Sequence, residues 1–204
     1  MTLAKAGYVA ACNFSFGEIR MTILTELHKD HVNLNKLLVV LRRKVDKLRA
    51  GDPPNFNLMG DVIHYIAHYA DGYHHPREDK LYDYFRGRSS VLDTHLTDCA
   101  AEHGKLKLSS TQLSEAIDGV LHDAVIPMGE LVDLLDQFVR LQLDHLDSEE
   151  GVLFPLIDDA ASEEDWVKLD ALLVVQTDPL FGEHKAAEYI DLYRDLIADI
   201  NATQ

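Results

Sequence analysis

The sequence reads His74-His75-Pro76-Arg77-Glu78-Asp79 in one place and His145-Leu146-Asp147-Ser148-Glu149-Glu150 in another. Both stretches contain H-x-x-x-E followed by an acidic residue. In an α-helix, residues four apart lie on the same face, about 6 Å apart along the axis. Each stretch therefore places a histidine and a glutamate where both side chains can bind the same pair of metal ions.

A lone histidine that follows an acidic residue precedes each of these stretches. Asp30-His31 lies 43 residues before His74, and Glu102-His103 lies 42 residues before His145. The chain thus repeats one unit, a histidine on one helix and then H-x-x-x-E on the next. Folding the two copies against each other would bring four histidines and two glutamates into one interior.

Four imidazoles and two carboxylates in an apolar interior are costly unless something satisfies them. Two metal ions would do so if each took two histidines, with Glu78 and Glu149 bridging the pair. Mixed imidazole and carboxylate ligands suit iron, and they also accept manganese or zinc. A solvated helix surface is the simpler interpretation of any one histidine, but the matched spacing of all six residues favours a metal site.

Apolar residues recur at helical spacing along almost the whole chain after Met21, and no stretch alternates like a β-strand. The pattern predicts four long helices, over about 22–49, 57–85, 91–121 and 127–155. Two shorter helices are expected afterwards, one behind a capping-box pattern at Ser162 and one over about 180–200. Short connections between the long helices predict an all-α, antiparallel up-down-up-down four-helix bundle.

Three parts are expected along the chain. Residues 1–20 form a leader that is disordered or precedes a later start at Met21, residues 21–160 form the bundle, and residues 161–204 form a helical extension packed on it. The short apolar stretch before Cys12 is interrupted by Lys5, which disfavours a secretion signal. Two distant cysteines, Cys12 and Cys99, make no disulfide framework, so we expect a cytoplasmic protein.

The net charge of −16 excludes some partners. A surface this negative repels phosphate backbones, so nucleic acid is not an expected partner.

No apolar run approaches the roughly 18 residues that a membrane-spanning helix needs, so no membrane association is expected. The aromatic residues along the second helix and the extra C-terminal helices are compatible with a homodimer.

The sequence resembles the hemerythrin-like HHE cation-binding proteins over about residues 22–160. The tails of the two motifs carry the resemblance as well, Glu78-Asp79-Lys80-Leu81-Tyr82 and Glu149-Glu150-Gly151-Val152-Leu153-Phe154-Pro155. The resemblance implies an antiparallel bundle around an oxo- or hydroxo-bridged pair of iron ions. The metal ligands that it implies are His31, His74, Glu78, His103, His145 and Glu149.

The chain also departs from the oxygen-carrying members of that family, which have a fifth histidine from an H-x-x-x-H pair. Here Cys99 stands four residues before His103, and Lys107 stands four residues after it. Two further side chains are possible additional ligands, namely His28, one turn before His31, and Cys99. Asp79 and Glu150 follow the predicted bridging glutamates and are expected to form hydrogen bonds to the ligand histidines.

Two other stripes on the second helix are predicted to lie away from the site. At about 100° per residue, His64, His68 and His75 share a face that is rotated from His74. Packing or hydrogen bonding is the expected role of that face, with a second metal site as the alternative. A further stripe consists of Tyr65, Tyr69 and Tyr73.

The function predicted from these residues is that of a non-haem di-iron protein that binds or senses a small oxidant, either dioxygen, nitric oxide or peroxide. The iron would do the chemistry, while the bundle supplies ligands and restricts water. No separate nucleophile or general base is evident, so hydrolysis is not expected, and spacing alone does not decide whether there is turnover. The alternative is an iron-handling protein (storage, donation or iron-centre repair) or a non-catalytic metal-binding module.

Overall fold

A computed structural model describes residues 23–52, 54–173 and 175–202. Within these ranges every regular element is a helix or a helical turn, and there is no β-strand. The prediction of an all-α protein is therefore confirmed, while the predicted leader at 1–20 lies outside the described residues. None of the described helices is long and apolar enough to cross a membrane.

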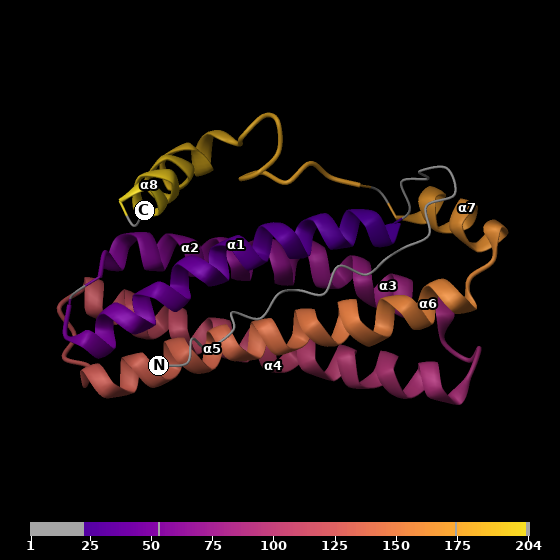
Figure 1. Ribbon diagram of the computed structural model, residues 1–204, viewed down its shortest axis with the longest axis horizontal. Coiled ribbons are helices and arrows are strands. Elements are labelled where there is room, and N and C mark those ends of the chain that lie inside the picture. The colour runs from indigo at the N-terminus through magenta and orange to yellow at the C-terminus, as the bar shows by residue number, and fades with distance from the viewer. Residues whose placement is uncertain (1–22, 53, 174, 203–204) are drawn as a thin grey trace, which may run out of the picture.

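Four long helical segments form the body of the fold (Figure 1). The first is α1 (Ile23–Ala50), and the third is α4 (Ser90–Leu121). The second consists of α2 (Phe56–Tyr69), a π turn (Ala70–His74) and α3 (His75–Phe85). The fourth consists of α5 (Met128–Ser148), a π turn (Glu149–Leu153) and α6 (Phe154–Ala160). The chain then continues through α7 (Glu163–Leu172), a 3₁₀ turn (Ala187–Tyr189) and α8 (Ile190–Asn201).

The long segments pack as a helical bundle. Helix α1 contacts α2 and α5, and α4 contacts the same two helices from the other side. Figure 1 shows all four segments running along the long axis of the molecule. Helix α7 contacts α1, and α8 contacts α2, so the C-terminal helices lie at opposite ends of the bundle's outer surface.

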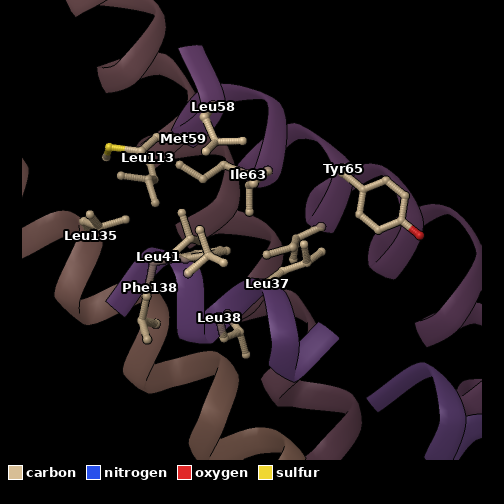
Figure 2. Packing of buried hydrophobic residues seen from close by; sticks show 14 of the residues in the cluster. Leu37, Leu38, Leu41, Leu58, Met59, Ile63, Tyr65, Leu113, Leu135 and Phe138 are labelled. Carbon is tan, nitrogen blue, oxygen red and sulfur yellow. The ribbon is translucent and has the colours of Figure 1, made fainter. Parts of the chain in front are cut away.

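Apolar side chains fill the bundle in two clusters. In the larger cluster, leucines of α1 pack against residues of α2, α4 and α5 (Figure 2). The smaller cluster lies at the other end, around Leu27, Phe85, Phe154 and Trp166. On α1 the smaller cluster ends at Leu27 and the larger one begins at Leu34, so a band between them is left for polar side chains.

Both H-x-x-x-E segments contain a π turn beside a proline. The His75 N–H bonds to the Ala70 carbonyl, and the Phe154 N–H bonds to the Glu149 carbonyl, five residues back in each case. Pro76 and Pro155 then follow, and a proline lacks the N–H that the carbonyl four residues earlier would accept. In both places that carbonyl belongs to the glycine of a G-x-x-x-P sequence, so the wider turn occurs where the α-helical ladder is already interrupted.

The first π turn corrects the predicted stripe of histidines. In an unbroken α-helix His75 would share a face with His68, seven residues earlier. One extra residue in the turn rotates everything after it by about 100°. His64 and His68 are exposed, whereas His75 is buried and lies beside His103. The prediction that His75 belongs to their face is therefore wrong.

Side-chain caps fix the starts of α4 and α7. The Ser89 side chain accepts the Leu92 N–H at the start of α4. Ser162 and Asp165 form a reciprocal capping box at the start of α7, which confirms that prediction. Arg88 and Tyr84 also bind the Asp165 carboxylate, so this cap ties α7 to the end of α3.

The last helix begins later than predicted. Residues 179–184 form turns and bends, the 3₁₀ turn begins at Ala187, and α8 begins at Ile190. Asp178 does accept the Leu180 and Phe181 N–H groups, as a helix cap would. A tight turn follows instead of a helix, and a Cβ on Gly182 would lie 2.5 Å from the Asp178 carbonyl oxygen. Glycine therefore allows the chain to reverse at this point.

Asp178 fastens this turn to the bundle. Its carboxylate accepts the Tyr65 hydroxyl at 2.7 Å and the Asn33 amide at 3.0 Å, in addition to the two turn N–H groups. Burial and the neighbouring Asp178 raise the pKa of Tyr65, so its hydroxyl stays protonated and acts as the donor. In Figure 2 this hydroxyl points away from the leucines of the core.

Removing the Tyr65 hydroxyl is expected to weaken this attachment. The variant Tyr65→Phe should lower the free energy of unfolding by about 1.5 kcal/mol, because a hydrogen bond to a carboxylate is lost. Urea unfolding of the full chain measures the change. The matched control is Tyr189→Phe, whose hydroxyl has no partner among the described residues although its ring contacts Tyr65. Equal stability of the two variants would contradict the prediction.

Candidate metal centre

The structure brings the six predicted ligand side chains together in the polar band between the apolar clusters. All six are buried, and Glu78 and Glu149 have no exposed surface at 0 %. Every long segment contributes to the group. The residues are His31 from α1, His74 and Glu78 from the second segment, His103 from α4, and His145 and Glu149 from the fourth segment.

The two halves of the chain form two neighbouring groups of donor atoms. In the first group His31 Nε2 lies 3.0 Å from His74 Nε2, and both lie close to Glu78 Oε1, at 3.3 and 3.1 Å. In the second group His145 Nε2 lies 3.3 Å from Glu149 Oε2. His103 Nε2 completes it, 3.8 Å from Glu149 Oε1.

Both glutamates face both groups. Glu78 contacts His31 through Oε1 and lies 3.5 Å from His103 through Oε2. Glu149 Oε2 lies 3.3 Å from His31 as well as 3.3 Å from His145. Each carboxylate therefore stands where it can bridge two ions, one in each group.

The innermost atoms of the cluster show that a metal pair fits. Four buried atoms in it have no hydrogen-bond partner among the described residues. A polar atom buried without a partner costs free energy, and these atoms converge on one another instead of being separated. They are Glu78 Oε2, His103 Nε2, His145 Nε2 and Glu149 Oε2. Imidazole and carboxylate donors arranged in this way match the ligand preference of iron, manganese and zinc.

A carboxylate lies behind each of the four histidines. Such a partner fixes the ring and leaves the inner nitrogen free to bind an ion. The pattern is the same in both copies of the repeat. In each copy one of these carboxylates belongs to the residue before the lone histidine, and the other belongs to the residue after the bridging glutamate. The contacts at Nδ1 are His74 with Asp30 at 3.2 Å, His145 with Glu102 at 3.1 Å, His103 with Asp79 at 3.0 Å and His31 with Glu150 at 2.7 Å.

The contacts of Asp79 and Glu150 agree with the expectation from their positions after the glutamates. Asp30 has further partners, since it also accepts the Tyr69 hydroxyl at 2.9 Å and lies 3.3 Å from Arg77 Nη1. The tyrosine stripe of the second helix thus begins beside the centre, while Tyr65 and Tyr69 stack along it.

The carboxylates of the cluster favour the protonated form of three of its histidines. Burial lowers the pKa of His103, but Glu149 and Glu78 outweigh that effect and raise it to about 10. The pKa values of His31 and His74 are also raised above their usual range, against the effect of burial, by the surrounding carboxylates. Protons on these imidazoles occupy the place that metal charge would take.

The glutamates show the opposite shift. Burial alone would raise the pKa of Glu78, yet His74, His103 and His31 hold it well below its ordinary value. For Glu149, burial and Glu78 raise the pKa, while the histidines outweigh both and lower it. Both carboxylates therefore stay ionised and able to bind cations at neutral pH.

The two possible additional ligands occupy different places. The His28 side chain is 52 % exposed and contacts Glu150 at 3.0 Å, outside the cluster. Cys99 is buried, and its thiol donates to Glu149 Oε1 at 2.9 Å. Tyr82 donates to the same oxygen. The Cys99 sulfur lies within 4.8 Å of the donor atoms of His103, His145 and Glu149. Cys99 is therefore placed beside the second group, whereas His28 is not.

Sequence reasoning missed one buried histidine at the centre. The ring of His75 lies 4.2 Å from that of His103 and 5.6 Å from that of His145, centroid to centroid. Burial and His103 lower the pKa of His75, although Asp71 partly opposes them. The signal that was available is the G-x-x-x-P sequence at 72–76, which marks the π turn that rotates His75 inward.

These features define a class of protein, a helical bundle that encloses a centre of histidine and carboxylate ligands suited to metal cations. The family model of the hemerythrin HHE cation-binding domain matches residues 22–165, which confirms the resemblance seen in the two motifs. The chain belongs to this hemerythrin HHE family. Comparisons with curated proteins and with solved structures gave no match.

Proposed function

We propose that this chain is a non-haem di-iron protein that binds or senses a small oxidant, either dioxygen, nitric oxide or peroxide. The observation that carries the proposal is the pair of histidine groups joined by two fully buried glutamates. Family membership supports a cation-binding centre in the same residues. We also infer that the four long segments run antiparallel, up-down-up-down, since short connections join them.

The chain's own residues have separate tasks in this proposal. His31 and His74 would hold one ion, His103 and His145 the other, and Glu78 and Glu149 both. When bound, the iron pair supplies reversible redox and ligand-binding chemistry at a fixed position. The carboxylates behind Nδ1 keep each imidazole in the orientation that ligation needs. Apolar clusters on both sides restrict the access of water to the centre.

The test combines metal analysis with optical spectroscopy of the full chain after iron loading. We expect about two iron ions per chain, as in other two-metal centres. His74→Ala is expected to lose most of this iron, because it removes one inner donor and leaves Asp30 without its imidazole partner. The exposed His68→Ala is the matched control on the same segment.

Adding oxygen, nitric oxide or peroxide to the loaded protein then separates the possible roles. An oxidant-binding centre changes its visible spectrum with at least one of the three. A centre that holds iron but responds to none of them supports the iron-handling alternative. A chain that takes up no metal, or a His74→Ala variant with unchanged metal, contradicts the proposal.

A further inference from the structure

His75 lies among the donor atoms of the second group of ligands. Its donor nitrogen, those of His103 and His145, and a carboxylate oxygen of Glu78 all lie within 4.8 Å of one another, and all four residues are buried. Donors on opposite sides of a single ion, at metal–nitrogen distances of about 2.1 Å, are separated by roughly 4 Å. The four donor atoms therefore have the spacing of ligands around one ion.

The surroundings of His75 match those of the predicted ligand histidines. Its Nδ1 lies 3.3 Å from Asp71 Oδ1. The other four imidazoles of the cluster each have a carboxylate at Nδ1 in the same way. With Nδ1 held by Asp71, Nε2 is the nitrogen that is available to an ion.

Comparing matched positions in the two copies of the repeat shows that the two halves carry different numbers of donor side chains. The residue after the first histidine of H-x-x-x-E is His75 in one copy and Leu146 in the other. The residue four before the lone histidine is Leu27 in one copy and Cys99 in the other. Both leucines are buried and carry no donor atom, whereas His75 and Cys99 both lie beside His103 and His145.

We propose that His75 is a third imidazole ligand of the ion held by His103 and His145, so that the two ion positions are chemically unequal. This inference rests on the proposed di-metal centre. His75 takes this role in preference to Cys99, because the thiol of Cys99 is engaged as a donor to Glu149. The π turn before His75 supplies the ligand from the second segment.

The experiment titrates the full, metal-free chain with ferrous iron alone under argon, against a chromophoric chelator. His75→Leu introduces the residue found at the matched position in the other copy. We expect its affinity for the second iron ion to fall at least about tenfold, leaving the first ion in place. Mössbauer spectra of the loaded parent should show two unequal iron sites. His68→Leu, on the exposed face, is the control and should bind iron as the parent does. Cys99→Ala is titrated alongside it as the test of the competing ligand, because the Cys99 sulfur lies near the same donor atoms.

Each outcome decides between the proposals. Loss of one ion in His75→Leu alone supports the inference, whereas parent-like binding by His75→Leu, or a loss confined to Cys99→Ala, overturns it. If the parent itself binds no iron, the proposed function fails together with the inference. Circular dichroism checks the helix content of the variants. His75→Gln is titrated in parallel, so that a variant with a polar side chain of similar length decides the question if leucine disturbs folding.

Discussion

Replacing Glu149 by alanine is expected to empty both ion positions at once. Glu149 lies 3.3 Å from His31 of the first group and 3.3 Å from His145 of the second, and it is fully buried. Its removal takes away a bridging ligand and one of the two negative charges that face the ion pair. Two cations in an apolar interior then lack compensation, and a buried charge without a partner is strongly disfavoured.

The measurement is iron content after loading and desalting, with Glu102→Ala as the matched control. Glu102 contacts His145 at Nδ1 and is not one of the inner donors. Loss of such an outer partner weakens metal binding by about 10- to 100-fold, so Glu102→Ala should retain iron at high metal concentration. Glu149→Ala should lose its iron even at metal concentrations that fully load the parent. Two ions per chain in Glu149→Ala would remove this glutamate from the bridging role.

The sequence contained most of the fold because its helices obey local rules. Apolar spacing located the long segments, and the capping-box pattern at Ser162 marked the first turn of α7. The repeated H-x-x-x-E unit also indicated which side chains meet, since residues four apart on a helix share a face whatever the tertiary packing. The gathering of His31 and His74 with His103 and His145 needed only the assumption that the two copies fold against each other.

What the sequence did not predict arises where the α-helical period fails. A face assignment made at a constant angle per residue holds only while the hydrogen-bond ladder is unbroken. The π turn at Ala70–His74 breaks it, and His75 moves from the predicted outer stripe to the centre. The late start of the last helix also arises from a local interaction that apolar spacing does not show. The Asp178 carboxylate accepts the Leu180 N–H of a tight turn and the Tyr65 hydroxyl.

The metal-free chain is expected to lose stability as the pH rises from about 6.5 to 9, where the unfolded histidines are neutral. A group with a raised pKa in the folded chain contributes stability that is complete below its unfolded pKa and is lost as the pH approaches the folded value. His103, with a folded pKa of about 10, and His31 and His74 all have raised values. Each of these histidines lowers the free energy of unfolding by about 1.4 kcal/mol per pH unit. This holds over the range in which the histidine is protonated in the folded chain and neutral in the unfolded chain.

The glutamates set the lower limit of the stable range. Glu78 and Glu149 have lowered pKa values, so their contribution is present above the unfolded value of about 4.3 and disappears as the pH falls below it. The metal-free chain should therefore be most stable between about pH 4.5 and 6.5. Urea unfolding at several pH values measures this curve. The variant His103→Gln should flatten its alkaline side, and the exposed His64→Gln should not.

Iron loading should reverse the alkaline side of this curve. Metal ions bind the same imidazole nitrogens in their neutral form, so ion binding displaces the protons and becomes stronger as the pH rises. Ligand binding to the folded chain alone adds to its stability, and the added stability grows with affinity. The loaded and metal-free curves should thus diverge between about pH 6.5 and 9. Parallel curves would mean that the protons and the metal ions do not compete for one set of histidines.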